Sequence, residues 1–164
     1  MDGEEKLMRA TGMLRRIDNL GRVAVPKELR RSLCISEGEP VEIFIEKEEV
    51  VLKKYSPVLE MKKIVTEFVH VVHDILSGNV FVTDRDQVVA SSESAQIGEK
   101  IDCTIEKVLE GEAIIESHLA IFPIRSEGFI LGAVGLRRKD IDATALKVAK
   151  MTASIIGKQL DSAS

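Results

Sequence analysis

Apolar and polar residues alternate in short runs over the first third of the chain, and turn-forming residues separate these runs. The segments 11–17 and 22–25 therefore predict two strands, joined by a turn over 18–21 in which Gly21 accepts left-handed geometry. The segment 26–33 predicts a short helix with a proline in its first turn. The segments 41–46 and 49–55 predict a hairpin, because Val41, Ile43 and Ile45 alternate strictly with other residues.

The pattern changes to a helical period after residue 57. Apolar residues recur at spacings of three and four, which predicts a helix over 58–77 that ends at Ser77, Gly78 and Asn79. This stripe consists of Val58, Met61, Val65, Phe68, Val72 and Ile75. It suits both an amphipathic helix that packs on its own domain and an inter-chain helical bundle. Additional apolar residues at 64, 69, 71 and 76 widen the stripe enough for both.

The remainder of the chain predicts a mixed domain. Residues 79–92 have the pattern of a strand, a turn and a strand, and 104–111 of a short helix. Residues 112–140 predict further strands with a turn at Gly128, and 140–161 predict a closing helix. The apolar stripe of that helix is Leu146, Ala149, Ala153, Ile156 and Leu160. Helix, antiparallel strands and helix in this order indicate an α+β fold.

Charge is distributed unevenly. The 164 residues have a net charge of −4, yet the segment Arg9–Arg31 holds seven cations and two anions, a net +5, which leaves −9 for the rest. The cations include two separated pairs, Arg15-Arg16 and Arg30-Arg31. A basic patch on an acidic protein predicts binding to a phosphate backbone, whereas a solvated charged surface is the alternative. The aromatic content of 4% disfavours stacking on single-stranded nucleic acid.

Size limits what the first segment can do alone. Four short strands and one helix within residues 11–55 bury too little apolar surface for a stable domain, and no disulfide or metal pattern supports them. Pairing with a second copy is the simplest remedy, and it would double the basic patch about a two-fold axis.

Two stretches, "ATGMLRRIDNLGRVAVPKELRRSL" and "VEIFIEKEEVVLKKYSP", resemble the DNA-binding domain of the AbrB-type transition-state regulators. The resemblance runs from about Met8 to Pro57, and within the family it favours the stage V sporulation protein T type, which continues into a GAF-like domain. It implies a swapped-hairpin β-barrel formed by a dimer over residues 8–55. It also implies a GAF-like α/β domain over 56–164, joined through the linker helix 58–77.

The same resemblance implies which residues face DNA. Its arginine positions fall in the first strand, in the "LGRV" turn and in the short helix, with Lys27 as a helper. These arginines are Arg15, Arg16, Arg22, Arg30 and Arg31. Since no recognition helix of normal length is predicted, we expect readout through DNA shape and flexibility.

The C-terminal half resembles a small GAF domain, and "FILGAVGL" resembles the late central strand of that fold. We expect a small or closed cavity, because the chain is short where such domains build their pocket. Candidate walls and polar groups are Val80, Val82, Val88, Ile121 and Ile130, with Thr83, Asp84, Arg85, Ser91 and Ser92. The run typical of cyclic-nucleotide binding is absent, which leaves sensing of another small molecule and a structural role as the alternatives.

Candidates for catalysis or metal binding are few. Cys34 and Cys103 are far apart and predict ordinary thiols; His70 and His73 lack an evident third ligand, and His118 stands alone. Ser91, Ser92 and Ser94 have no evident base, and Gly132 and Gly135 do not form a phosphate-binding loop. The sequence therefore predicts neither an enzyme nor a metal or cofactor.

These observations predict a DNA-binding transcription regulator of sporulation or stationary-phase genes. We expect double-stranded DNA, further copies of the chain as a dimer of dimers, and an unidentified small molecule as partners. No apolar run has the length of a membrane span or of a secretion signal, so we expect a cytoplasmic, nucleoid-associated protein. The alternatives are an antitoxin with the same fold and an oligomerisation protein that does not bind DNA.

Overall fold

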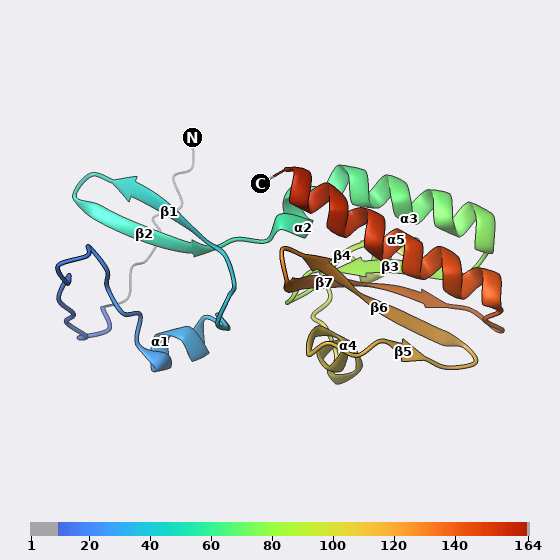
Figure 1. The fold of residues 1–164 in the computed structure, drawn as a ribbon, viewed down its shortest axis with the longest axis horizontal. Coiled ribbons are helices and arrows are strands. Elements are labelled where there is room, and N and C mark those ends of the chain that lie inside the picture. The colour runs from blue at the N-terminus through green and yellow to red at the C-terminus, as the bar shows by residue number, and fades with distance from the viewer. Residues whose placement is uncertain (1–9, 164) are drawn as a thin grey trace. The chain divides into compact units, whose positions relative to one another are not determined.

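The computed structural model of the chain describes residues 10–163 (Figure 1). These residues belong to two compact units, one up to Glu39 and one from Pro40 onward. The boundary predicted from the sequence, between residues 55 and 56, would instead place the hairpin with the first unit, and it stays a prediction.

The first unit contains the turn and the helix that the sequence predicts, but not the strands. Helix α1 spans Lys27–Ser32 and follows Pro26, and a turn closes between Asp18 and Arg22. The predicted strands 11–17 and 22–25 are wrong for the single chain, which has no strand there. A strand exists only through hydrogen bonds to a neighbouring strand, and these segments have none within the described chain.

Strands β1 (Val41–Glu46) and β2 (Glu49–Lys54) form the predicted antiparallel hairpin. Ile43 lies opposite Leu52 and Ile45 opposite Val50, so four apolar side chains share one face of the hairpin. No residue of either strand is buried.

The predicted linker helix consists of two helices, α2 (Pro57–Glu60) and α3 (Lys62–Leu76), separated by Met61. The buried face of α3 differs from the predicted stripe, because Val69 and Leu76 are buried whereas Ile75 is exposed. Val65 and Val72 are buried as well. The α3 helix therefore packs on its own domain, as the simpler of the two interpretations predicted.

Five antiparallel strands form the sheet of the second unit, in the order β4-β3-β7-β6-β5. Their bounds are β3 Asn79–Thr83, β4 Val88–Ser91, β5 Ile114–Ile115, β6 Leu119–Ser126 and β7 Phe129–Arg137. Strands β6 and β7 meet in a two-residue turn, where Glu127 and Gly128 both have positive φ. This confirms the predicted turn at Gly128.

Helices cover both faces of this sheet. Helices α3 and α5 (Ala143–Ser162) lie side by side on one face, and α4 (Cys103–Leu109) lies on the other, as Figure 1 shows. A short 3-10 turn, η1 (Ser94–Gln96), follows β4. Strand β3 is buried along its whole length, with Val80 and Val82 in the α3/α5 core and Phe81 in the α4 core. A strand with two buried faces explains the run of apolar residues there.

Glycines on β7 let neighbouring groups approach closely on both faces of the sheet. A Cβ atom at Gly135 would lie 2.0 Å from the Phe81 ring, so the ring occupies the space above this strand. A Cβ atom at Gly132 would lie 2.0 Å from the carbonyl oxygen of Thr83. Near Gly135, the α4 face is thus filled by the Phe81 ring.

Helix α5 approaches strand β6 with similarly little space. Asp142 caps its first turn by accepting a hydrogen bond from Ala145 N at 2.7 Å. Near the other end, Asp161 accepts a 2.6 Å hydrogen bond from Ser126 Oγ. Between these anchors, a Cβ atom at Gly157 would lie 2.2 Å from the carbonyl oxygen of Arg125.

We predict that Gly157→Ala destabilises the C-terminal domain by about 1–3 kcal/mol, as overpacking does. In an unconstrained helix the same change would be favourable by about 1 kcal/mol, so the sign of the effect reports the close approach. Ser154→Ala, at an exposed position of the same helix, is the control. Urea unfolding measures both variants, and a Gly157→Ala protein as stable as the wild type would contradict the packing described here.

Candidate nucleic-acid interface

A closed turn positions the first of the DNA-facing candidates, Arg22. Asp18 Oδ1 accepts hydrogen bonds from the backbone N–H groups of Leu20 and Arg22, each at 2.9 Å. Asp18 Oδ2 lies 2.9 Å from Arg22 Nε, and Gly21, at φ +75°, donates back to the Asp18 carbonyl at 3.0 Å. The turn therefore holds the start of the Arg22 side chain, while most of that side chain stays exposed.

The same hydrogen bonds act on the charge of Asp18. The backbone N–H of Arg22, with the Arg22 side chain and the N–H of Leu20, holds the pKa of the Asp18 carboxyl below its ordinary value. Asp18 is thus a carboxylate at neutral pH and orients the neighbouring arginine. We did not predict this role, although an Asp four residues before an Arg in a glycine turn is a recognisable signal.

Arg15 and Arg16 precede the turn, in the segment that has no strand in the single chain. Both side chains are exposed, and Arg15 Nη1 donates to the carbonyl oxygen of its neighbour Leu14 at 3.1 Å. Within the described chain, Arg15 and Arg16 belong to no helix or strand.

Arg30 and Arg31 occupy the last turn of helix α1. Arg31 is exposed and Arg30 is half-buried. Two backbone hydrogen bonds close the helix after them, from Cys34 N to the Arg31 carbonyl at 3.1 Å and from Ile35 N to the Arg30 carbonyl at 2.8 Å. The five predicted arginines and Lys27 thus all belong to the first unit, on three consecutive segments.

Apolar side chains alternate with these cations and are themselves exposed. Leu14 is 90% exposed, Ile17 and Leu20 are each 70% exposed, and no residue between 10 and 57 is buried. Apolar side chains do not bind phosphate groups, so their exposure needs a different explanation from that of the arginines.

The other polar candidates form structural contacts. His70 and His73 are exposed, and His73 Nδ1 lies 2.6 Å from the Gly78 carbonyl oxygen. Within residues 10–163 no three His, Cys, Asp or Glu side chains gather in a way that would hold a metal ion. None of the helices between residues 10 and 163 combines the length and the apolar character of a membrane span.

The serines of the predicted pocket are also engaged. Ser91 Oγ donates to Gln96 Oε1 at 3.0 Å, and Ser92 Oγ accepts from Val80 N at 2.9 Å. Asn79 Nδ2 donates to the same Gln96 oxygen at 2.9 Å. Within the described chain, Thr83 Oγ1 is the one buried side-chain oxygen or nitrogen with no hydrogen-bond partner.

Comparisons with known proteins identify both halves. A family described as "Antidote-toxin recognition MazE, bacterial antitoxin" matches residues 14–60. The Transition state regulatory protein AbrB of Bacillus subtilis is 50% identical over 50 residues, which cover 30% of this chain and 52% of AbrB. The solved N-terminal DNA recognition domain of AbrB is 50% identical; the match covers 29% of this chain and 91% of that domain, with a TM-score of 0.26.

The C-terminal half has the GAF-like α/β fold that the sequence predicted. The cyanobacteriochrome receptor PixJ matches 66% of this chain and 100% of the solved PixJ chain, with a TM-score of 0.55 and 14% sequence identity. At this identity the likeness establishes the fold and nothing about ligands.

One relative spans both halves. Stage V sporulation protein T of Bacillus subtilis is 36% identical over 177 aligned positions, which cover 94% of this chain and 99% of that protein. These relatives are regulators and not enzymes, which confirms the prediction that the chain is not an enzyme. The chain therefore belongs to the stage V sporulation protein T family of AbrB-type transition-state regulators, with an AbrB-type N-terminal segment and a GAF-like C-terminal domain.

Proposed function

We propose that this protein binds double-stranded DNA and regulates transcription of sporulation or stationary-phase genes. The observation that carries the proposal is the 50% identity to AbrB, whose N-terminal domain is solved as a DNA recognition domain. The DNA-facing side chains in this proposal are Arg15, Arg16, Arg22, Arg30 and Arg31. Each carries a planar guanidinium that can grip a phosphate with two hydrogen bonds.

The exposed apolar residues support a dimer that closes a swapped-hairpin barrel. Thirteen of the 21 exposed large hydrophobic residues in the described chain lie before residue 55. A two-stranded hairpin with an apolar face is marginal by itself, and the unpaired segments 11–17 and 22–25 lack partner strands. A second copy would supply both the missing hydrogen bonds and the missing apolar contacts, and would place two sets of arginines about a two-fold axis.

A second surface supports a dimer of dimers. On α3, Ile64, Val71 and Ile75 are exposed at spacings of seven and four, which places them on one face of the helix. Met151 on the neighbouring helix α5 is exposed as well. These residues, rather than the buried Val65, form the inter-chain contact in this proposal.

The residues of the GAF-like domain support assembly more than they support sensing of a small molecule. The predicted pocket walls lie on different faces of the sheet, since Val80 and Val82 belong to the α3/α5 core and Ile121 to the α4 core. The α4 face is filled near Phe81 and Gly135. We infer that the domain acts chiefly as an assembly module, and that any effector is small.

The match to an antitoxin family supports toxin neutralisation as a second candidate function. A toxin-neutralising protein would bind one partner protein through a flexible tail, whereas a folded domain follows the N-terminal segment here. We therefore favour a regulator that works in the cytoplasm, associated with the nucleoid. DNase footprinting or a chromatin pull-down across the host genome tests this choice, because an antitoxin would protect few sites beyond its own promoter.

We predict that Arg30→Ala with Arg31→Ala weakens DNA binding on the order of 10- to 100-fold while the protein keeps its oligomeric state. The double variant removes up to four phosphate contacts per dimer, so the slope of log affinity against log salt becomes less negative by about 2–4. Gel-shift titrations at several salt concentrations measure both quantities.

The matched control is Lys100→Ala with Lys107→Ala, which removes the same charge from exposed positions around α4. Equal losses of affinity in the two double variants would mean that total charge, not these arginines, determines binding.

We predict that Ile43→Asp converts the protein to monomers. Ile43 is 65% exposed in the single chain, where such a change alters stability by only about 0.5 kcal/mol. In a barrel made by two chains, the carboxylate would be buried without a partner. Ile115→Asp, at a 57% exposed strand position of the C-terminal domain, is the control. Sedimentation that gives the same mass for both variants would refute the shared barrel.

We predict that Val71→Lys with Ile75→Lys converts tetramers to dimers that bind DNA less tightly, because linked sites raise the effective concentration. Substitution of Val65, which is 0% exposed, would disrupt the domain instead and is unsuitable. Ile97→Lys with Ile115→Lys adds the same charge outside α3. Light scattering measures the mass, and a wild-type protein that is only dimeric would overturn the dimer of dimers.

A further inference from the structure

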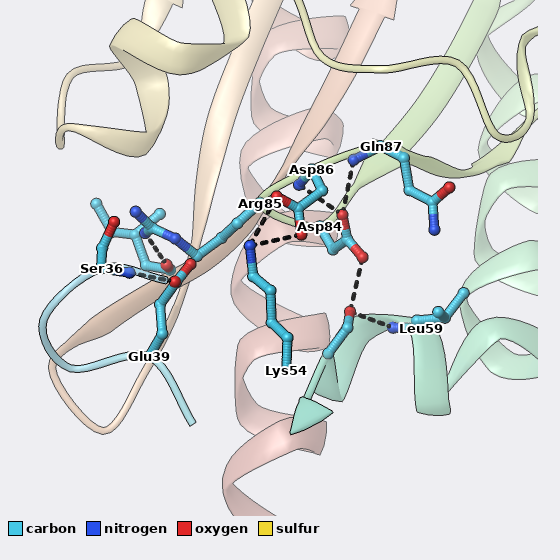
Figure 2. Close-up of polar contacts among 10 residues, drawn as sticks. Ser36, Glu39, Lys54, Leu59, Asp84, Arg85, Asp86 and Gln87 are labelled. Atoms are coloured by element: carbon cyan, nitrogen blue, oxygen red, sulfur yellow. Dashed lines mark hydrogen bonds and ion pairs between the residues drawn. The ribbon is translucent and has the colours of Figure 1, made fainter. Parts of the chain in front are cut away.

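Two side chains at the junction between strand β2 and helix α2 contact two side chains of the turn between β3 and β4 (Figure 2). Lys54, the last residue of β2, places Nζ 2.7 Å from each of Asp86 Oδ1 and Oδ2. Ser56, which directly precedes α2, donates from Oγ to Asp84 Oδ2 at 2.8 Å. We call Lys54, Ser56, Asp84 and Asp86 the linker clamp. Its contacts join residues 28 and 32 positions apart, so chain connectivity does not explain them.

Asp84 orders the turn and still has an oxygen available for the linker. Its Oδ1 accepts hydrogen bonds from the backbone N–H groups of Asp86 and Gln87, each at 2.8 Å. These bonds leave Oδ2 to Ser56. Asp84 is only 3% exposed, so its charge is stabilised by these three donors rather than by water.

Ser56 joins the β3–β4 turn to helix α2. Its Oγ also accepts a hydrogen bond from Leu59 N at 3.1 Å, which caps the first turn of α2. The same hydroxyl therefore donates to the turn and accepts from the helix. Movement of Asp84 away from Ser56 would loosen both the position of the hairpin and the start of α2.

The core of the GAF-like domain determines where the turn lies. A Cβ atom at Gly132 of β7 would lie 3.2 Å from the Asp84 Cα, so the turn is in close contact with the central strand. The carbonyl oxygen of Asp86 accepts from Ile101 N at 3.0 Å, just before α4. A change in the spacing of β7 or in the loop before α4 would thus displace both aspartates.

We propose that the linker clamp fixes hairpin β1–β2 to the β3–β4 turn and makes DNA affinity depend on that turn, although the turn itself does not touch DNA. The inference rests on the proposed DNA binding by the N-terminal segment. An ordered linker costs less conformational freedom when the protein binds, so a clamped protein binds more tightly than a released one. Lys54, Ser56, Asp84 and Asp86 are positioning residues in this mechanism.

The test compares Asp86→Ala with Glu112→Ala. Both remove one exposed or half-buried carboxylate from the C-terminal domain, and general electrostatics would raise DNA affinity equally in both. Loss of the clamp would lower DNA affinity instead. We therefore expect Asp86→Ala to bind DNA about five-fold more weakly than Glu112→Ala, which is the effect that a partly exposed ion pair typically has. The charge-swapped variant Lys54→Asp with Asp86→Lys should regain most of this loss.

Fluorescence anisotropy with labelled duplex DNA measures the affinities, and hydrogen exchange at the Leu59 amide measures the clamp without DNA. Asp86→Ala and Ser56→Ala should both speed that exchange, whereas Glu112→Ala should not. Equal affinity of Asp86→Ala and Glu112→Ala, or a swapped variant as weak as Asp86→Ala, would overturn the proposal. A wild-type protein that does not bind DNA would instead refute the proposed function, and the exchange data would still decide whether the clamp exists.

Discussion

No side chain between residues 10 and 57 is buried in the single chain, although this segment is rich in leucine, isoleucine and valine. The hydrophobic effect makes such exposure unfavourable. In the dimer that we propose, a second copy of the chain covers the apolar hairpin face and pairs with the unpaired segments. The proposed arrangement of the arginines follows from that requirement, because their positions depend on the strands that pairing would create.

The C-terminal domain, by contrast, buries its apolar side chains within a single chain. Its sheet is covered on both faces, and glycines at 132, 135 and 157 allow backbone and ring to approach where a side chain would collide. Next to Gly135, the Phe81 ring leaves little room for a ligand on the α4 face. Within the described chain, an apolar stripe on α3 stays exposed, which supports the assembly that we propose.

Short polar contacts position the parts that a hydrophobic core does not hold. Asp18 closes the turn that carries Arg22, and Asp84 closes the turn that receives the linker. In both places one carboxylate accepts backbone N–H groups through one oxygen and a side chain through the other. Charge-assisted hydrogen bonds of this kind define geometry over a few residues, both in the exposed turn at Asp18 and in the turn at the buried Asp84.

The sequence by itself determined the hairpin, the helix at 27–32, the β6–β7 turn and the closing helix, because each depends on local periodicity or turn chemistry. Motif resemblance identified the five arginines, and their roles remain predictions. Tertiary structure decided which face of α3 is buried, since spacings of three and four allowed two stripes and only packing on the sheet selects one. It also decided that segments 11–17 and 22–25 are not strands in a single chain and that Lys54 meets Asp86. Strand pairing and long-range ion pairs depend on what lies opposite in space, and the order of residues along one chain does not specify that.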